Sequence, residues 1–339
     1  MKTNVFKEAL TSDGFIDLKT ALPLQIPISV MIEPTNHCNY RCSFCPTGDK
    51  ELLNRVKRPK GYMSFEFFKK IINDILELKN STNQKIKSIL LYKDGEPLLH
   101  KEIHKMVAYI KENEAADFVA ITSNASLLNS EISNNLVNSG LDDLRISITA
   151  ANNENYKSIS KTDYDLDEIA SKVKELYEIK SQNNSNLRIT AKIVDTGMSE
   201  KEKQSFKNRF KKISDRIQIS PIMGWSDSGQ KDWRLGIKRE IKKAPLVCED
   251  PFAKMAINFN GTASVCCVDW SHNTVVGDLN KESFREVWQG EKLKKFRIVH
   301  LEGKRAKIKA CRNCDHIKDK EDYANIDSIR EKLLNIYRN

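Results

Sequence analysis

Strand-like and helix-like patterns alternate along residues 28–223 of the sequence. Short apolar runs bounded by turn residues are typical of buried strands, and apolar positions three and four apart are typical of helices. The expected strands are residues 28–33, 87–93, 118–122, 144–149, 187–195 and 216–223, and the expected helices are residues 65–76, 102–113, 130–138, 166–180 and 200–213. Strands separated by helices predict a parallel sheet with crossover connections. Six such units are two short of an eightfold barrel, so the sheet should curve without closing.

The pattern changes after this alternating region, which predicts a second, smaller unit. Two apolar runs flank Asn260-Gly261, a favoured hairpin turn, at residues 254–259 and 262–268, and residues 283–299 have a helical pattern. The fold class is therefore expected to be α/β. The expected division of the chain is a lead-in over 1–27, the curved sheet over 28–223, a linker over 224–247, a hairpin-plus-helix domain over 248–325 and a terminal helix over 326–339.

Composition limits the function classes. The net charge is +10, but acidic residues are interspersed and no aromatic-rich basic strands accompany the charge, so nucleic-acid binding is disfavoured. A solvated basic face and a docking surface for an acidic electron donor remain as interpretations of the charge. No apolar run approaches the roughly 20 residues of a membrane span, so a cytoplasmic protein is expected. In that compartment eight cysteines favour metal binding over disulfides.

Three cysteines, Cys38, Cys42 and Cys45, follow the first expected strand at spacings of four and three. Three thiolates can hold three irons of a cubane cluster and leave the fourth iron open to a non-protein ligand. A structural zinc site normally takes four protein ligands. The missing ligand therefore favours chemistry in which a small molecule binds the cluster and accepts an electron, although a chance triad or a structural metal loop is the alternative.

With Phe44 directly before its last cysteine, this triad resembles the radical S-adenosylmethionine (SAM) enzymes, and the resemblance covers residues 28–223. It implies a partial (β/α)6 barrel and a [4Fe-4S] cluster held by Cys38, Cys42 and Cys45, with SAM chelating the open iron. It also implies reductive cleavage of SAM to methionine and a 5′-deoxyadenosyl radical that abstracts a hydrogen atom. The electron would come from a reductant such as flavodoxin or ferredoxin.

The same resemblance assigns SAM contacts to the ends of the strands. Gly95 and Glu96 match the end of the family's Gly-Gly-Glu run, which supports the SAM amino group, but Asp94 stands in place of the first glycine. A serine or asparagine at a strand end can bond the ribose or the local backbone, and Lys192 can face the SAM carboxylate or solvent. The cofactor-binding residues expected in this way are Phe44, Gly95, Glu96, Ser123, Asn124, Ser147 and Lys192.

The later cysteines resemble the SPASM auxiliary-cluster domain in its shortened form, called Twitch, because none follows Cys314. The resemblance implies an auxiliary [4Fe-4S] cluster held by Cys248, Cys266, Cys311 and Cys314; a zinc ion on the same thiolates is the alternative. Adjacent residues of a strand face opposite ways, so Cys267 should not join Cys266 on the cluster. Cys267 is then a small buried residue or, in an epimerase, a hydrogen-atom donor.

The layout resembles that of a radical SAM dehydrogenase that oxidises a ring hydroxyl to a ketone. We therefore expect a small polyol or amino-sugar-like substrate, with the auxiliary cluster accepting an electron. Asp269 is the candidate base, and Arg145 and Arg234 are weaker polar partners.

Rival functions remain open. They are a peptide maturase, a radical epimerase that uses Cys267, an RNA-modifying enzyme and an iron–sulfur electron carrier. Against the maturase, only 37 residues precede Cys38, too few for the leader-recognising domain that many maturases carry.

Overall fold

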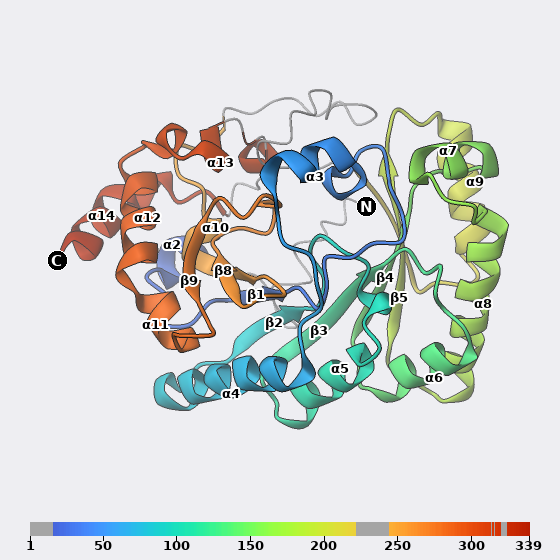
Figure 1. The fold of residues 1–339 in the computed structure, drawn as a ribbon, viewed down its shortest axis with the longest axis horizontal. Helices are drawn as coiled ribbons and strands as arrows, with labels where there is room; N and C mark the ends of the chain where they lie inside the picture. Colours follow the sequence, from blue (N-terminus) through green and yellow to red (C-terminus); the bar gives the residue numbers. More distant parts are fainter. Residues whose placement is uncertain (1–15, 222–243, 313, 315, 320–323) are drawn as a thin grey trace.

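The computed structural model describes residues 16–221, 244–312, 314, 316–319 and 324–339. Nine described strands form one sheet in the order β6-β5-β4-β3-β2-β1-β7-β8-β9. The first six run parallel, which confirms the expected partial barrel (Figure 1). They are β1 (Ser29–Ile32), β2 (Ile86–Leu90), β3 (Ala116–Ser123), β4 (Asp143–Ile148), β5 (Arg188–Asp195) and β6 (Arg216–Pro221).

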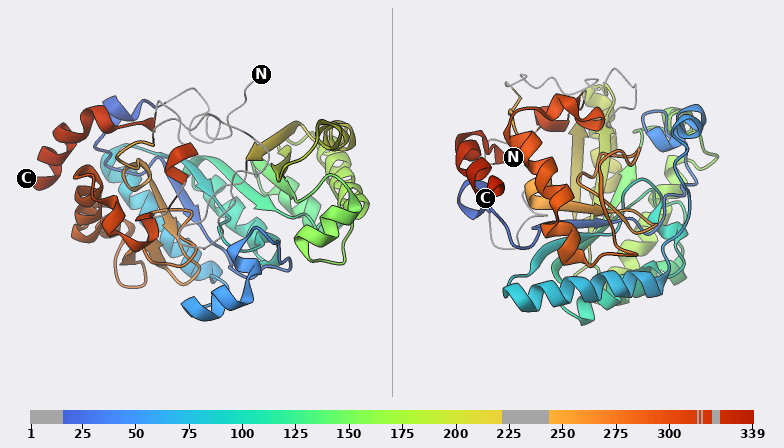
Figure 2. Two further views of the ribbon diagram at one scale, coloured as in Figure 1. Left: turned by 90° about the horizontal axis from the view of Figure 1, so that it is seen from above. Right: turned by 60° about the vertical axis from the view of Figure 1, so that its left-hand side comes forward.

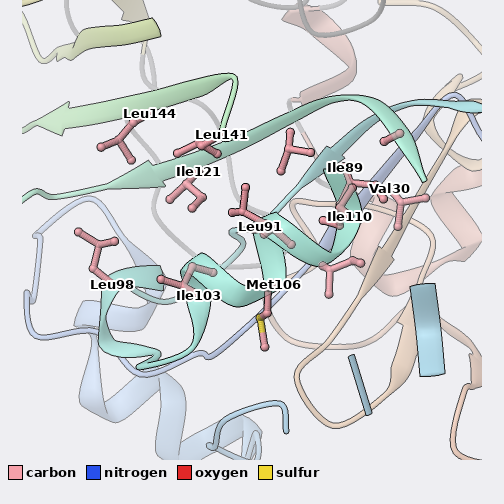
Figure 3. Close-up of a cluster of buried hydrophobic side chains, with 14 of the residues drawn as sticks. Val30, Ile89, Leu91, Leu98, Ile103, Met106, Ile110, Ile121, Leu141 and Leu144 are labelled. Carbon is pink, nitrogen blue, oxygen red and sulfur yellow. The ribbon is translucent and has the colours of Figure 1, made fainter. Parts of the chain in front are cut away.

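Helices between the strands cover one face of the parallel sheet (Figures 1 and 2). They are α4 (Phe65–Thr82), α5 (Ile103–Glu112), α6 (Ser130–Asn138), α8 (Leu166–Gln182) and α9 (Glu200–Phe210). Figure 3 shows Ile89, Ile121 and Leu144 of the strands above Ile103, Met106 and Ile110 of α5. Each of these residues is at most 4% exposed, and burying such a side chain stabilises the fold by about 1.5–3 kcal/mol.

The other face of the parallel sheet is polar, because side chains alternate between the two faces of a strand. In β4, Leu144, Ile146 and Ile148 enter the core, so Asp143, Arg145 and Ser147 lie on the opposite face. The register places polar residues of neighbouring strands beside them. We call this set the polar face: Asp143, Arg145, Ser147, Thr190, Lys192 and Gln218.

The C-terminal region extends the same sheet. Strand β7 (Lys254–Ile257) pairs in parallel with β1, and β8 (Thr262–Ser264) and β9 (Val275–Asp278) continue it in antiparallel fashion. The sheet is therefore continuous across the expected boundary between the two units. The remaining helices here are α10 (Asp250–Ala253), α11 (Phe284–Gln289), α12 (Glu291–Leu301), α13 (Lys309–Arg312) and α14 (Arg330–Arg338).

A small second core joins the two ends of the described chain. Leu18 and Leu22, in and directly after α2 (Leu18–Ala21), pack with Phe252, Leu301 and Leu333. Figure 1 shows α2 beside α12 and α14. No described helix is both long and apolar enough to cross a membrane.

Two expected elements of the hairpin-plus-helix domain were wrong in extent. The second hairpin strand, expected to reach residue 268, ends at Ser264, where the pairing register shifts and turns follow. The helix expected over 283–299 is broken at Gly290, where a Cβ would lie 2.3 Å from the Glu286 carbonyl oxygen. The linker expected over 224–247, with Arg234, falls almost wholly outside the described residues.

Two helices within the alternating region of residues 28–223 were not expected at all. These are α3 (Lys50–Val56) and α7 (Asn153–Ser160), which begin after the capping side chains of Asp49 and Asn152. Each cap accepts a hydrogen bond from a backbone N–H of the first turn, so both N-cap signals were present in the sequence.

Candidate metal centres

The three cysteines of the first triad come together in the loop after β1. The surrounding protein raises the pKa of the Cys38 thiol to about 12, although the residue as a whole is exposed, and burial also raises the pKa of Cys42 and Cys45. Cys45 raises the pKa of both Cys38 and Cys42 by charge repulsion, so the sulfurs are close neighbours. Such thiols become thiolates readily only when a metal binds them.

Contacts with α7 hold the cysteine loop in place. The Tyr40 hydroxyl contacts the Tyr156 hydroxyl at 3.1 Å. The backbone N–H of Arg41 donates to the Ser160 carbonyl at 3.0 Å, and that of Ser43 donates to the Ile159 carbonyl at 2.9 Å. The loop therefore docks on the C-terminal end of a helix that the sequence pattern did not predict.

Gly95 allows the loop after β2 to lie against the segment that precedes Cys38. A Cβ on Gly95 would lie 2.3 Å from the Thr35 carbonyl oxygen and 2.6 Å from that of His37. The next residue, Glu96, donates its backbone N–H to the His37 carbonyl at 2.8 Å. Only glycine fits at this approach, since the atoms in the way belong to rigid backbone.

Glu96 is buried beside the first triad, where its charge raises the pKa of Cys38. Its carboxylate accepts a hydrogen bond from the Ser123 hydroxyl and one from the Asn124 backbone N–H, both at 2.7 Å. The Asn124 amide donates to the side chain of Asn39, inside the cysteine loop, at 2.9 Å. The structure thus brings these expected residues together. Their contacts to ribose remain a prediction.

Lys192 is the cation on the polar face that has no hydrogen bond or ion pair with any described residue. Burial and the nearby Arg145 charge lower its pKa to about 8. Arg145 is itself committed, to Asp143 at 2.9 Å and to the Tyr92 hydroxyl at 3.0 Å. Ser147 is the register partner of Lys192 on β4. A half-buried, unpaired ammonium is suited to receive an anion.

Asp94, in place of the family's glycine, forms a buried ion-pair cluster. It accepts from Lys93 at 2.6 Å and from Arg58 at 2.7 Å, and all three side chains are at most 1% exposed. Arg58 also donates to the Trp270 carbonyl at 2.7 Å, and Lys93 donates to the Asp269 carbonyl at 3.2 Å. This cluster ties the loop after β2 to the segment that follows Cys266. Sequence reasoning missed Arg58 altogether, because no local signal pairs it with Asp94.

Glu33, Asp94 and His272 place possible ligand atoms within 4.8 Å of one another. Two cations, Lys93 and Arg58, already contact Asp94 and balance both carboxylates. A metal ion here would be repelled by them, so we assign no metal to this cluster. Glu33 was also missed, although a charged residue at the end of an apolar strand was a visible signal.

The four cysteines expected to hold the auxiliary cluster, Cys248, Cys266, Cys311 and Cys314, line one cavity between α10, the turn after β8 and α13. Arg305 also lines it and donates to the Cys311 carbonyl at 2.7 Å. Four thiols around one cavity fit a closed four-iron cluster, and they also fit zinc.

The expectation that Cys266 and Cys267 face opposite ways was wrong. Cys266 lies in an irregular segment after β8 and Cys267 begins the next turn, so neither is in a strand, and their thiols are hydrogen-bonded to each other. The Cys267 sulfur lies within 4.8 Å of ligand atoms of Asp250 and His316. We retain Cys266 as the expected ligand because it lines the cavity, and this assignment stays a prediction.

Asp269 is buried, and its carboxylate orders the turn that follows the hairpin cysteines. It accepts from the backbone N–H of Asn273 at 3.0 Å, from the Thr274 N–H and hydroxyl at 2.7 Å each, and from the Ser271 hydroxyl at 3.3 Å. Acting as a base would require it to give up one of these bonds. The role of Asp269 as a base, like that of Arg145 as its polar partner, stays a prediction.

Comparison with known proteins identifies the chain. Residues 32–194 match the family model described as the radical SAM superfamily, and residues 248–315 match SPASM, described as an iron-sulfur cluster-binding domain. The chain belongs to the radical SAM superfamily. This radical SAM protein therefore has a SAM-binding [4Fe-4S] cluster and an auxiliary cluster, and its two groups of thiols have the donor chemistry to hold them.

Individual relatives differ in the activity that their names state. A GTP 3',8-cyclase of Staphylococcus carnosus is 28% identical over 142 residues, 41% of this chain and 39% of that protein. An S-adenosyl-L-methionine-dependent 2-deoxy-scyllo-inosamine dehydrogenase of Niallia circulans is 26% identical over 78 residues, 23% of this chain and 31% of that protein. The radical SAM protein thus matches two fifths or less of the length of these relatives.

A solved structure shows the same fold over most of the chain. BtrN in complex with AdoMet and 2-DOIA superposes with a TM-score of 0.54 and 15% identity, covering 88% of this radical SAM protein and 98% of that chain. Because 88% of the chain is covered, the shared fold extends into the C-terminal region.

Proposed function

We propose that this radical SAM protein is a dehydrogenase that oxidises an alcohol carbon of a small polyol or amino-sugar-like molecule. The observation that carries the proposal is the cavity lined by four cysteines, because a cluster closed by four thiolates can exchange an electron without binding substrate. After hydrogen abstraction the substrate radical must lose one electron and its hydroxyl proton to become a carbonyl. The cluster would accept the electron, and Asp269, the candidate base, would accept the proton.

The residues around the first triad would hold and orient the cofactor. When bound, the cluster with SAM supplies a 5′-deoxyadenosyl radical, which abstracts a carbon-bound hydrogen. Cys38, Cys42 and Cys45 would hold the cluster. Glu96 would accept from the SAM amino group, since its carboxylate lies beside Cys38 and is fixed by Ser123 and Asn124.

The polar face supports a hydroxyl-rich substrate. Asp143 accepts from Thr190 at 2.8 Å as well as from Arg145, so this part of the sheet is a fixed hydrogen-bond network. Buried polar groups that are already ordered discriminate strongly between a substrate that can hydrogen-bond and one that cannot. An apolar substrate would leave the Ser147 hydroxyl of the polar face without a partner.

A product assay tests the proposal. Reconstituted protein with SAM and a reductant would be incubated with polyols, amino sugars, GTP and peptides. The proposal predicts one 5′-deoxyadenosine for each ketone or aldehyde formed from a polyol or amino sugar. Solvent deuterium in recovered substrate would instead indicate an epimerase, a modified peptide would indicate a maturase, and cyclised GTP would indicate a cyclase. An absence of SAM cleavage would favour an electron carrier.

The proposed pairing of Lys192 with the SAM carboxylate predicts a pH dependence. With a pKa of about 8, Lys192 is charged below that pH and loses its charge above it, so SAM affinity should fall as the pH rises through 8. Lys192→Met should remove a charge-assisted bond of about 1.5–3 kcal/mol, roughly a ten- to hundredfold loss of affinity, and flatten the profile. Equilibrium binding of SAM to the parent and to Lys192→Met, from about pH 6.5 to about pH 9.5, measures the loss of affinity and its pH dependence. Unchanged affinity in Lys192→Met would exclude the pairing.

A basic pocket beside the cysteine loop predicts how the reductant docks. Arg41, Lys50, Lys57, Arg58 and Lys60 line this pocket of about 710 Å³ together with Leu53 and Asn54. Replacing Lys50 and Lys60 by Glu should slow reduction by flavodoxin about tenfold and reduce its salt dependence, because charge steers acidic partners. Reduction by dithionite should not change. Lys174→Glu, an exposed lysine on α8, is the control. Equal slowing with both reductants would contradict docking here.

A further inference from the structure

One buried histidine on α12 has no partner to explain its place. His300 is 1% exposed, and neither of its ring nitrogens makes a hydrogen bond with any described residue. Phe296 stacks on the ring at a centroid distance of 5.0 Å and fixes its plane. A buried polar group without a partner is costly, so an unpaired imidazole in the core needs an explanation.

The surroundings of His300 indicate which group its ring N–H could contact. It lines the same cavity as the four thiols expected to hold the auxiliary cluster. Burial, together with the Arg305 charge, lowers its pKa to about 4, so the imidazole is neutral and has one N–H to donate.

The carboxylates that line the cavity are already engaged. Asp269 orders its own turn, and Asp250 is paired with Lys254 at 2.8 Å. His316 also lines the cavity, and its Nε2 lies 3.3 Å from Asp250 Oδ2. The four thiols offer His300 sulfur acceptors in the same cavity.

We propose that the N–H of His300 donates a hydrogen bond to a sulfur of the auxiliary cluster and raises its reduction potential. Hydrogen bonds to cluster sulfurs stabilise the more negative, reduced state. An auxiliary cluster that accepts an electron benefits from such a shift. The inference rests on the auxiliary cluster and not on the proposed dehydrogenase reaction.

The test measures the potential of that cluster in the full chain, with Cys38, Cys42 and Cys45 replaced by Ala so that it gives the only iron–sulfur signal. His300→Phe keeps a ring against Phe296 and removes the donor. It should lower the midpoint potential by about 59 mV, a tenfold change in the one-electron equilibrium. His300→Gln keeps an N–H donor and should shift the potential less. His104→Phe, on α5 outside the cavity, is the control and should not shift it.

A second readout does not depend on the variants folding. Pulsed electron paramagnetic resonance of the reduced cluster, with histidine labelled by ¹⁵N, should show one weak histidine nitrogen coupling that His300→Phe or His300→Gln alters. Iron-loaded His300→Phe with the parent's potential would overturn the proposal. So would the absence of a histidine coupling in the parent, or a coupling strong enough for a direct iron ligand. If His300→Phe does not load iron, the proposal is tested by the histidine coupling in the parent and by its change in His300→Gln.

Discussion

Replacing Asp94 by Asn is expected to lower the free energy of unfolding by about 3–5 kcal/mol, the cost of breaking a buried ion pair. Asn has nearly the same shape as Asp, so the loss in the free energy of unfolding reports the removal of the negative charge. Without it, Lys93 and Arg58 are buried without their closest counter-charge, and the charges of Glu33 and Asp269 balance them only in part. A loss of this size is a large part of the 5–15 kcal/mol that typically stabilises a domain.

Urea unfolding of the holoprotein measures this difference, with Glu178→Gln as the control. Glu178 is 56% exposed in its pair with Lys174, so its replacement should cost less than about 1 kcal/mol. Burial alone would raise the pKa of Asp94, but Lys93 and Arg58 lower it below the ordinary 3.8. Its stabilisation is therefore present above pH 3.8 and is lost as the pH falls through the lowered pKa. A gap between parent and variant that persisted in strong acid would contradict the ion-pair account.

Replacing Cys311 by Ala is expected to abolish product formation while SAM cleavage continues. It removes one of four thiolates, so the auxiliary cluster should be lost and the iron content should fall from about eight to about four per chain. The first triad is separate from Cys311 and should keep its four irons. The substrate radical would then lack its electron acceptor, and 5′-deoxyadenosine would form without oxidised product.

Metal analysis distinguishes this account from a zinc site on the same thiols. A zinc site predicts about four irons and one zinc in the parent, and loss of the zinc alone in Cys311→Ala. Cys267→Ala tests the assignment of Cys266, because the two thiols are in contact. Loss of the auxiliary iron in Cys267→Ala, and its retention in Cys266→Ala, would transfer the ligand role to Cys267.

The alternating core could be predicted from the sequence because its signals are local. Apolar runs marked the six parallel strands, and α6 was predicted to the residue as Ser130–Asn138. The pairing of β7 with β1 could not be predicted, since it joins strands more than 200 residues apart. The result is one continuous sheet where the sequence pattern changes.

The site residues also fall into those that local spacing predicts and those that only the fold brings together. The spacing of Cys38, Cys42 and Cys45 indicated their proximity, because they share one loop. The turn at Cys266 and Cys267 was missed, since strand alternation does not reveal the register shift after Ala263. The Asp94 cluster was missed because Arg58 and Trp270 reach it only through the fold. The departure from the family motif at Asp94 was visible, as was the adjacent Lys93, but the second cation, Arg58, could not be assigned to Asp94 from the sequence.

The measurement that tests the account most directly is SAM cleavage by the reconstituted protein and by Cys42→Ala. An open iron held by three thiolates predicts 5′-deoxyadenosine from the parent under reducing conditions, and none above background from Cys42→Ala. Cys311→Ala should still cleave SAM. Equal 5′-deoxyadenosine from the parent and Cys42→Ala, or none from a fully iron-loaded parent, would contradict it.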